Sequence, residues 1–365
     1  MQRRDQLLGD VLEFYDHMRV PLSSIERDTR QGEYRYYGAQ GVIDHIDNYI
    51  FDGQFVLIAE DGANLVTRNE PIAFLVDGRF WVNNHAHVVK GKDGVADDYY
   101  VTRLLNSMNI AGFITGAAQP KLSQQSLKLI KVALPNYDTQ RRIVAVFSAY
   151  DGLIDNNRKR IALLEEAARL LYREWFVHLR VPGHEHVRIV DGVPDAWQRL
   201  ELGRVLTLKR GYDLPAARRA SGPVPVVSSS GVTGCHTHAK ASGPGVVTGR
   251  YGTLGEVYFI ETEYWPLNTA LYVSDFKGHD PFFVFQMLKS LLRGVGTQKA
   301  AVPGVDRNVL HKMLVVWPSA ALRRAFVDMV RDNQRQIRVL TAMNDKLAEA
   351  RDLLLPRLMS GEIAV

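Results

Sequence analysis

The sequence predicts an α+β protein in which two globular parts alternate with two long helices. Apolar residues recur at heptad spacing over residues 138–180, and the same spacing returns near the C-terminus. The segments that precede these two stretches repeat short motifs in a common order, which indicates an internal duplication. Within those segments short apolar runs alternate with turn residues, as is typical of mixed α+β domains.

The first globular part, residues 1–135, is expected to hold several short strands. Residues 72–76 and 79–82 are apolar runs that flank the dipeptide Asp77-Gly78. Asp-Gly is typical of two-residue hairpin turns, so we expect these two runs to pair as a hairpin. The part is the size of one domain.

The first long helix is expected over residues 136–180. Its heptad pattern has charged residues on the outer faces and an apolar seam with one polar member. At about 1.5 Å per residue the helix is roughly 50–60 Å long, so we expect it to hold two parts of the molecule apart. The seam residues are Ile154, Asn157, Ile161, Leu164 and Leu171.

The third part, residues 181–318, combines a linker with a second globular domain that resembles the first. Residues 202–206 correspond to residues 8–12, and residues 226–232 correspond to residues 36–42. Strands are expected at residues 245–248 and 255–260. Short helices are expected over residues 99–108 and 281–292, one in each half.

The second long helix is expected over residues 319–365. Its seam is Val330, Asn333, Ile337, Leu340 and Leu347. When the two helices are aligned on their apolar positions, Asn157 falls on Asn333. A lone polar seam residue fixes register, so we infer that the helices pair with each other. The alternative is two unrelated amphipathic helices, each lying on its own domain.

Composition favours a folded protein of the cytoplasm. Of 365 residues 46% are hydrophobic, no apolar run is long enough for a membrane span, and the N-terminus lacks a signal peptide. Cys235 is the only cysteine, as in a reducing compartment. The net charge is +5, and basic side chains outnumber acidic ones over residues 195–318, which permits a polyanionic partner.

Common enzyme motifs are missing from the sequence. It has no phosphate-binding Gly-x-x-x-x-Gly-Lys-Ser/Thr loop, no dinucleotide-binding glycine turn, and no Asn/Asp-Pro-Pro-aromatic motif of amino-methyltransferases. Glu60 and Asp61 could serve acid–base chemistry, but Arg250 and Tyr251 replace them in the second repeat. We therefore expect no catalytic residues and no bound cofactor in this chain.

Two histidine-containing groups are candidate metal sites. His85 and His87 have strand spacing and lack an evident third ligand. Cys235, His236 and His238 lack a fourth, and structural zinc sites usually have four. We therefore expect no metal.

Polar, aromatic and basic loop residues recur in both halves. Arg, Gln, Asn and Ser are the side chains that read base edges, while Lys and Ser also contact phosphates. For any one residue a solvated loop is the simpler interpretation, but the set as a whole favours DNA contact. The candidate DNA-binding residues are Arg30, Gln31, Arg35, Tyr37, Gln40, Arg68, Asn69, Gln119, Lys121, Lys209, Arg210, Tyr212, Arg218, Ser229, Arg250, Tyr251, Gln298 and Lys299.

The chain resembles the specificity subunits of type I restriction-modification systems. The stretches LPNYDTQRRIV at residues 134–144 and LYREWF at 171–176 resemble the central conserved region of that family, and LLPRLMSGEI at 354–363 resembles its distal conserved region. Residues 36–41, 60–64 and 116–122 look like motifs of its target recognition domains.

The resemblance implies both a fold and a role. Two target recognition domains would be joined by an antiparallel coiled coil with pseudo-twofold symmetry. Each domain would read one half of a split double-stranded DNA target, and the coiled coil would set the spacer. Methyltransferase subunits, most simply two, would dock on the helices, and a motor-nuclease subunit would join for cleavage. Those partners would hold S-adenosylmethionine and ATP.

Two alternatives from other classes of protein are also compatible with the sequence. One is a stand-alone sequence-specific DNA-binding regulator, which would bind its target without a partner. The other is a metal-dependent nuclease that uses His85, His87 and Glu60.

Overall fold

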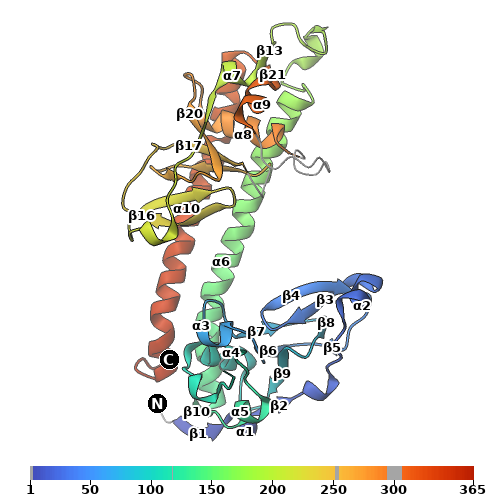
Figure 1. Ribbon diagram of the computed structural model, residues 1–365, viewed down its shortest axis with the longest axis vertical. Helices are drawn as coiled ribbons and strands as arrows, with labels where there is room; N and C mark the ends of the chain where they lie inside the picture. Colours follow the sequence, from blue (N-terminus) through green and yellow to red (C-terminus); the bar gives the residue numbers. More distant parts are fainter. Residues whose placement is uncertain (1–2, 117, 251–254, 294–305) are drawn as a thin grey trace. The chain divides into compact units, whose positions relative to one another are not determined.

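The computed structural model describes residues 3–116, 118–250, 255–293 and 306–365. The chain forms two compact units: unit 1 contains residues 1–156 and 343–365, and unit 2 contains residues 157–342. Both long helices, α6 (Tyr137–Tyr172) and α10 (Ala320–Ser360), contribute to each unit (Figure 1). No helix in the described ranges is long and apolar enough to cross a membrane.

Unit 1 contains a strand pair and two four-stranded sheets. β1 (Arg3–Leu7) pairs antiparallel with β10 (Lys131–Pro135). One sheet has the order β2-β9-β6-β7, and the other has the order β4-β3-β8-β5 with β3 and β8 parallel. The remaining strands are β2 (Leu12–Phe14), β3 (Gln31–Gly38), β4 (Gly41–Ile46), β5 (Phe51–Asp52), β6 (Phe55–Ala59), β7 (Ala73–Val76), β8 (Arg79–Val82) and β9 (Ala86–Gly91). The short helices are α1 (Leu8–Val11), α2 (Ser24–Thr29), α3 (Asn64–Thr67), α4 (Asp98–Ser107) and α5 (Gln124–Lys128).

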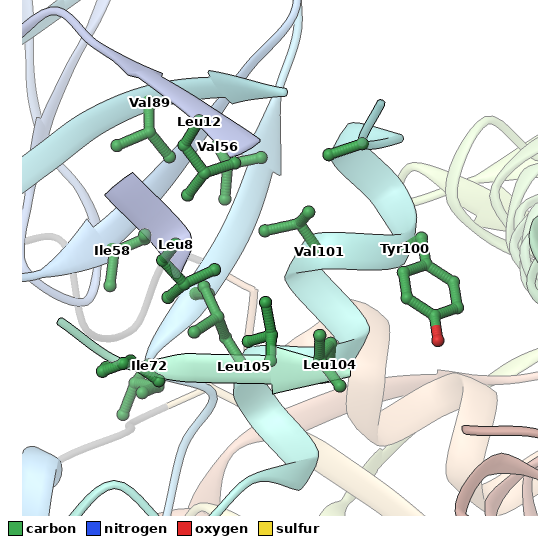
Figure 2. Close-up of a cluster of buried hydrophobic side chains, with 14 of the residues drawn as sticks. Leu8, Leu12, Val56, Ile58, Ile72, Val89, Tyr100, Val101, Leu104 and Leu105 are labelled. Atoms are coloured by element: carbon green, nitrogen blue, oxygen red, sulfur yellow. The ribbon is translucent and has the colours of Figure 1, made fainter. Parts of the chain in front are cut away.

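Helix α4 covers the first of these sheets and closes the main core of unit 1. The Asp97 side chain caps the helix by accepting a hydrogen bond from the Tyr100 backbone N–H at 3.0 Å. Buried residues of α4 recur at helical spacing, which gives the helix one apolar face. Figure 2 shows Val101 and Leu105 on this face, close to the side chains of α1 and the sheet.

The hairpin predicted across Asp77-Gly78 is wrong. β7 pairs with β6 in one sheet, whereas β8 pairs with β3 and β5 in the other. The turn carries the chain from sheet to sheet. Phe80 of β8 stacks on Phe51 with ring centroids 5.4 Å apart and lies edge-on to Tyr37. These aromatic partners come from distant segments, and they outweigh the local turn preference.

Unit 2 repeats this plan. β13 (Gln198–Glu201) pairs antiparallel with β21 (Leu314–Trp317), and the two sheets have the orders β14-β20-β17-β18 and β16-β15-β19. The strands are β14 (Thr207–Arg210), β15 (Val224–Ser228), β16 (Gly231–His236), β17 (Gly245–Gly249), β18 (Val257–Ile260), β19 (Trp265–Pro266) and β20 (Ala270–Asp275). The helices are α7 (Leu202–Val205), α8 (Pro281–Leu291) and α9 (Arg307–Lys312), and a small hairpin of β11 (Ile189–Val190) and β12 (Val193–Pro194) precedes them.

The common topology confirms the duplication inferred from the sequence. The order β2-β9-β6-β7 corresponds to β14-β20-β17-β18, and β4-β3-β8 corresponds to β16-β15-β19. β3 and β8 are parallel, as are β15 and β19. The two short helices expected over residues 99–108 and 281–292 are α4 and α8, which hold equivalent places. The predicted α+β class with a repeated module is confirmed.

The two long helices run antiparallel, as the contacts inside each unit establish. In unit 1 the start of α6 packs with the end of α10: Asp151 pairs with Arg351 at 2.7 Å, and Phe147 shares a core with Leu358. In unit 2 the end of α6 packs with the start of α10, where the Tyr172 and Phe326 ring centroids are 5.7 Å apart. All ten predicted seam residues are buried or half-buried. Their pairing in heptad register stays a prediction, as do the bounds of the four predicted domains.

Candidate nucleic-acid interface

Three loop motifs of unit 1 meet at one edge of its sheets. The Asn83 N–H donates to the Tyr37 carbonyl at 3.0 Å, which ties the residue after β8 to the end of β3. The Glu60 N–H donates to the His85 carbonyl at 2.9 Å, and the Leu122 N–H donates to the Glu60 carbonyl at 2.8 Å. The segments around residues 36–41, 60–64 and 116–122, which are far apart in the sequence, therefore form one backbone frame. We call this set of backbone hydrogen bonds the loop frame.

A buried ion network holds the loop frame of unit 1 from beneath. His87 is 1% exposed, with Nδ1 2.7 Å from the Asp16 carboxylate and Nε2 2.8 Å from the Leu122 carbonyl. Both partners can accept hydrogen bonds, so the ring bridges a buried carboxylate and a backbone carbonyl. Arg19 and Lys121 hold Glu60 at 2.8 and 3.2 Å.

The network also sets the ionisation of its carboxyl groups. Burial alone acts to raise the pKa of Asp16, but the hydrogen bond from His87 and its charge hold that pKa below its ordinary value. Burial likewise opposes ionisation of Glu60, and the Arg19 hydrogen bond with the charge of His87 lowers the pKa of that group. His87 and Glu60 thus act together as part of the support of the loop.

The two histidines considered as a metal pair do not converge. His87 is buried on Asp16, whereas the half-exposed His85 lies 2.7 Å from the Asp61 carboxylate. Within the described ranges no group of three or more His, Cys, Asp or Glu side chains could hold a metal ion. Cys235 is exposed.

The described residues of unit 2 contain two of the three bonds of the loop frame, with different side chains. The Leu267 N–H donates to the Val227 carbonyl at 2.8 Å, and the Arg250 N–H donates to the Thr269 carbonyl at 3.0 Å. These bonds are the equivalents of Asn83 to Tyr37 and Glu60 to His85. The backbone geometry is kept while Glu60 becomes Arg250, so the two edges present side chains of opposite charge.

The candidate residues of unit 1 divide between surface and support. Gln40, Asn69, Gln119 and Lys121 are exposed. Arg35 is also exposed and donates to the Asp77 carbonyl at 2.9 Å. These side chains can be reached by a ligand.

Other candidates of unit 1 hold the structure together. Tyr37 is 5% exposed and packs in a core. Arg68 donates to three carbonyls at the end of α4, those of Leu105, Asn106 and Met108. Arg30 and Gln31 lie at the opposite end of β3 from the loop frame, where Arg30 pairs with Asp47 at 2.8 Å and Gln31 donates to Arg27 and Asp44.

The candidate residues of unit 2 are mostly accessible. Lys209, Arg210 and Arg218 are exposed, and Tyr212, Ser229 and Arg250 are half-buried. Arg210 donates to the Asn268 carbonyl at 3.3 Å, which places it beside the loop frame. Tyr251, Gln298 and Lys299 lie outside the described residues.

Sequence reasoning missed two basic residues. Arg19 bonds the Glu60 carboxylate and the Ala86 carbonyl, although no motif surrounds it. Lys240 lies over the Tyr212 and Trp265 rings at 5.8 and 5.3 Å, a cation–π arrangement beside the second loop frame. Both positions depend on contacts between distant segments, so the only available signal was their charge.

Residues 6–166 match the family described as "Type I restriction modification DNA specificity domain". The match to this family therefore covers the N-terminal part of unit 1 and most of α6, just under half of the chain.

Individual relatives cover different shares of the chain. It is 35% identical over 146 residues to the putative type I restriction enzyme specificity subunit S.HindORF215P of Haemophilus influenzae, which is 40% of this chain and 37% of that protein. It is 22% identical over 347 residues to the type I restriction enzyme MjaIX specificity subunit of Methanocaldococcus jannaschii. This match covers 83% of this chain and 78% of that protein. The fold is similar to that of the type I restriction-modification S subunit of M. genitalium, with a TM-score of 0.62 and 15% sequence identity. The match covers 98% of this chain and 96% of that one.

Proposed function

We propose that this chain is the DNA-sequence-recognition subunit of a type I restriction-modification complex and that it is itself non-catalytic. Each unit reads one half of a bipartite double-stranded target. The observation that carries this is the loop frame: two of its backbone bonds in unit 1 have equivalents in unit 2, where the side chains differ. A repeated frame with exchanged side chains suits the reading of two different half-sites, because base edges are distinguished by side-chain donors and acceptors.

The accessible side chains of each loop frame have the chemistry that base reading needs. In unit 1 Gln40, Gln119 and Lys121 offer amide and ammonium groups, and in unit 2 Arg210 and Arg250 offer guanidinium groups. Gln recognises adenine in the major groove and Arg recognises guanine, each through two hydrogen bonds. We therefore propose that the two half-sites differ in base composition.

Partners supply the chemistry that this chain lacks. We propose that methyltransferase subunits, two in number, dock on the long helices and that a motor-nuclease subunit joins them. S-adenosylmethionine and ATP then belong to those partners, and the complex works in the cytoplasm on cellular DNA. The long helices support this proposal because they connect both recognition units.

Methylation mapping tests the proposal directly. DNA from cells that carry this chain and its methyltransferase should be methylated at one split sequence, with both half-sites and the spacer read in the same experiment. Methylation without the chain, or at unrelated sequences, would contradict it. Tight, specific binding by the chain alone that the methyltransferase does not alter would favour a stand-alone regulator.

Arg250→Ala is expected to weaken recognition of one half-site only, by about 1–3 kcal/mol if the guanidinium makes a bidentate base contact. The Arg250 contribution to the loop frame is a backbone bond, so the frame survives the substitution. Binding is measured by titration against duplexes that carry either half-site alone. Arg335→Ala, which removes an exposed charge from α10, is the control. Equal losses on both half-sites count against the assignment.

Deleting one heptad from each long helix, residues 157–163 and 333–339, is expected to change the preferred spacer and to keep both half-sites. Seven residues of helix are about 10 Å long, equivalent to roughly three base pairs. A duplex series with different spacers measures the preference. Deletion from one helix alone is the control and should abolish binding, because the seams lose register. An unchanged spacer preference after the paired deletion would refute this role of the helices.

A further inference from the structure

A basic pocket lies in unit 2 where α8 packs beside the C-terminal part of α6. Its volume is about 410 Å³, within the range of small-ligand sites. Arg169 and Arg173 line it from the α6 side, and Gln286, Lys289 and Arg293 line it from the α8 side. Of the described residues that line this pocket, none is acidic.

One buried polar atom at the pocket lacks a partner among the described residues. Arg169 uses two of its nitrogens to hold the Glu166 carboxylate, whereas its third, Nη1, is buried and meets no acceptor there. Gln286, which is 4% exposed, lines the same pocket. Buried polar atoms in proteins are normally hydrogen-bonded, so the Arg169 nitrogen indicates a site built for an acceptor.

The charge around the pocket is strongly positive. Glu166 is bound by Arg169: the hydrogen bond from Arg169 and the charges of Arg293 and Arg173 hold the pKa of Glu166 below its ordinary value. Lys289 lies over the Phe285 ring at 5.4 Å, an interaction that leaves its positive charge in place. One carboxylate therefore faces four cations, and the excess favours an anionic ligand.

The pocket is not a requirement of the repeated fold. When the two long helices are aligned on their seams, Arg169 and Arg173 correspond to Asp345 and Glu349. The second copy of the helix thus has acidic residues where the first has basic ones. If these charges served only to pack the helix against its domain, their sign would be the same in both copies. We therefore infer that Arg169 and Arg173 interact with a ligand of unit 2.

We propose that this pocket binds a phosphate group and that the phosphate belongs to the backbone of the bound DNA. Arg forks pair with phosphate oxygens through two parallel hydrogen bonds, Lys adds a point charge, and the Gln286 amide adds a neutral donor. A phosphate held here positions the DNA on unit 2 without reading sequence. The inference rests on the proposed DNA-binding function.

The test removes two charges from the pocket in the full chain bound to its methyltransferase. The variant is Arg173→Gln with Lys289→Gln, and the control is Arg335→Gln with Lys312→Gln, which removes the same charge from exposed positions on α10 and α9. Affinity is measured by fluorescence anisotropy for two duplexes. One carries the target sequence that methylation mapping identifies, and the other carries a scrambled sequence. The salt concentration is varied over roughly 50–300 mM, because the release of counterions from phosphates makes affinity depend steeply on salt in this range.

The pocket variant should bind both duplexes about 5- to 30-fold more weakly at low salt, with the ratio between them unchanged. The slope of log affinity against log salt should fall in magnitude by about 1 for each phosphate that the variant no longer neutralises. The control should keep the wild-type slope. A pocket variant with the wild-type slope overturns the proposal.

Two further measurements separate the possible sources and failures. Inorganic phosphate is titrated into the DNA-free wild type and the pocket variant. If only the wild type binds phosphate, but both have the same slope of log DNA affinity against log salt, the pocket binds a free phosphate compound. That result overturns the proposal that the phosphate belongs to DNA. Equal binding of target and scrambled duplexes by the wild type would contradict the proposed function, while the slope still tests the pocket. Arg173→Lys with Lys289→Arg should restore the slope if charge, and not folding, is responsible.

Discussion

Replacing Phe326 with alanine is expected to lower the free energy of unfolding of unit 2 by about 3–5 kcal/mol. Phe326 is completely buried near the start of α10, and its ring lies 5.7 Å from Tyr172, 5.5 Å from Phe176 and 6.0 Å from Phe283. These three rings come from α6, the turn that ends it, and α8. The substitution leaves a cavity at the point where both long helices meet the recognition unit, and such a cavity collapses only in part.

Tryptophan fluorescence during denaturant unfolding measures this effect. Trp175, Trp197, Trp265 and Trp317 lie in unit 2 and only Trp81 lies in unit 1, so the signal follows unit 2. The matched control is Met329→Ala on the same helix, at a position that is 57% exposed. The control should change stability by no more than about 0.5 kcal/mol. A Phe326 variant as stable as the control would contradict the assigned packing.

Asp16→Ala is expected to destabilise unit 1 by about 3–5 kcal/mol, because it breaks a buried ion pair by removing one partner. The Asp16 carboxylate accepts hydrogen bonds from the His87 ring, the Gln124 amide and the Val88 N–H at 2.7, 2.8 and 2.8 Å. Alanine removes the carboxylate that these three groups share and leaves a polar site in the interior without its acceptor. The loop frame rests on His87 through the Leu122 carbonyl, so DNA binding by unit 1 should fall as well.

The same variant should change the acid sensitivity of unit 1. The folded-state pKa values of Asp16 and Glu60 lie below their ordinary values. Their contribution to stability is therefore complete above the unfolded-state pKa, near 4, and is lost as the pH falls through the lowered folded-state pKa. Denaturant unfolding followed by circular dichroism from pH 6 to pH 3 should show a smaller loss for Asp16→Ala than for the wild type. Asp28→Ala, at an exposed position, should keep the wild-type slope; a wild-type slope in Asp16→Ala would refute the role of the network.

The loop frames support the proposal that one fold reads two sequences. In each unit the bonds that shape the edge are made by backbone groups, so side chains can be exchanged without loss of geometry. Glu60 needs Arg19 and Lys121 to balance its charge, whereas Arg250 occupies the equivalent position in the other unit with the opposite charge. Under the proposed function, specificity would then change through side chains alone.

The sequence was sufficient for the architecture where the signal repeats. The common order of motifs revealed two modules, and the seam pattern revealed two pairing helices. These signals are strong because the two halves of the chain can be compared with each other, and chance matches between them would not occur in the same order. It was insufficient at Asp77-Gly78. The dipeptide fits a hairpin, but the choice of strand partner depended on Phe51 and Tyr37, which no local pattern connects to Phe80.

The candidate site shows the same division. Gln40, Gln119, Lys121 and Arg250 could be selected by residue type and by their place in repeated loops, and they lie accessible or half-buried beside the loop frames. Tyr37 and Arg68 have equally suitable side chains but support the fold, since one fills a core and the other binds carbonyls at the end of α4. Residue type gives the chemistry that a side chain can perform, and burial decides whether a ligand reaches it.

By itself the sequence determined that this protein has two copies of one α+β module, each followed by a long amphipathic helix, because hydrophobic periodicity and repeated motifs are local properties of the chain. Only the tertiary structure decided which loops converge, that His87 and Asp16 support them, and that Arg169, Arg173, Lys289 and Arg293 surround one pocket. Those facts depend on contacts between residues distant in sequence, and such contacts form only when packing in three dimensions selects among many locally acceptable pairings.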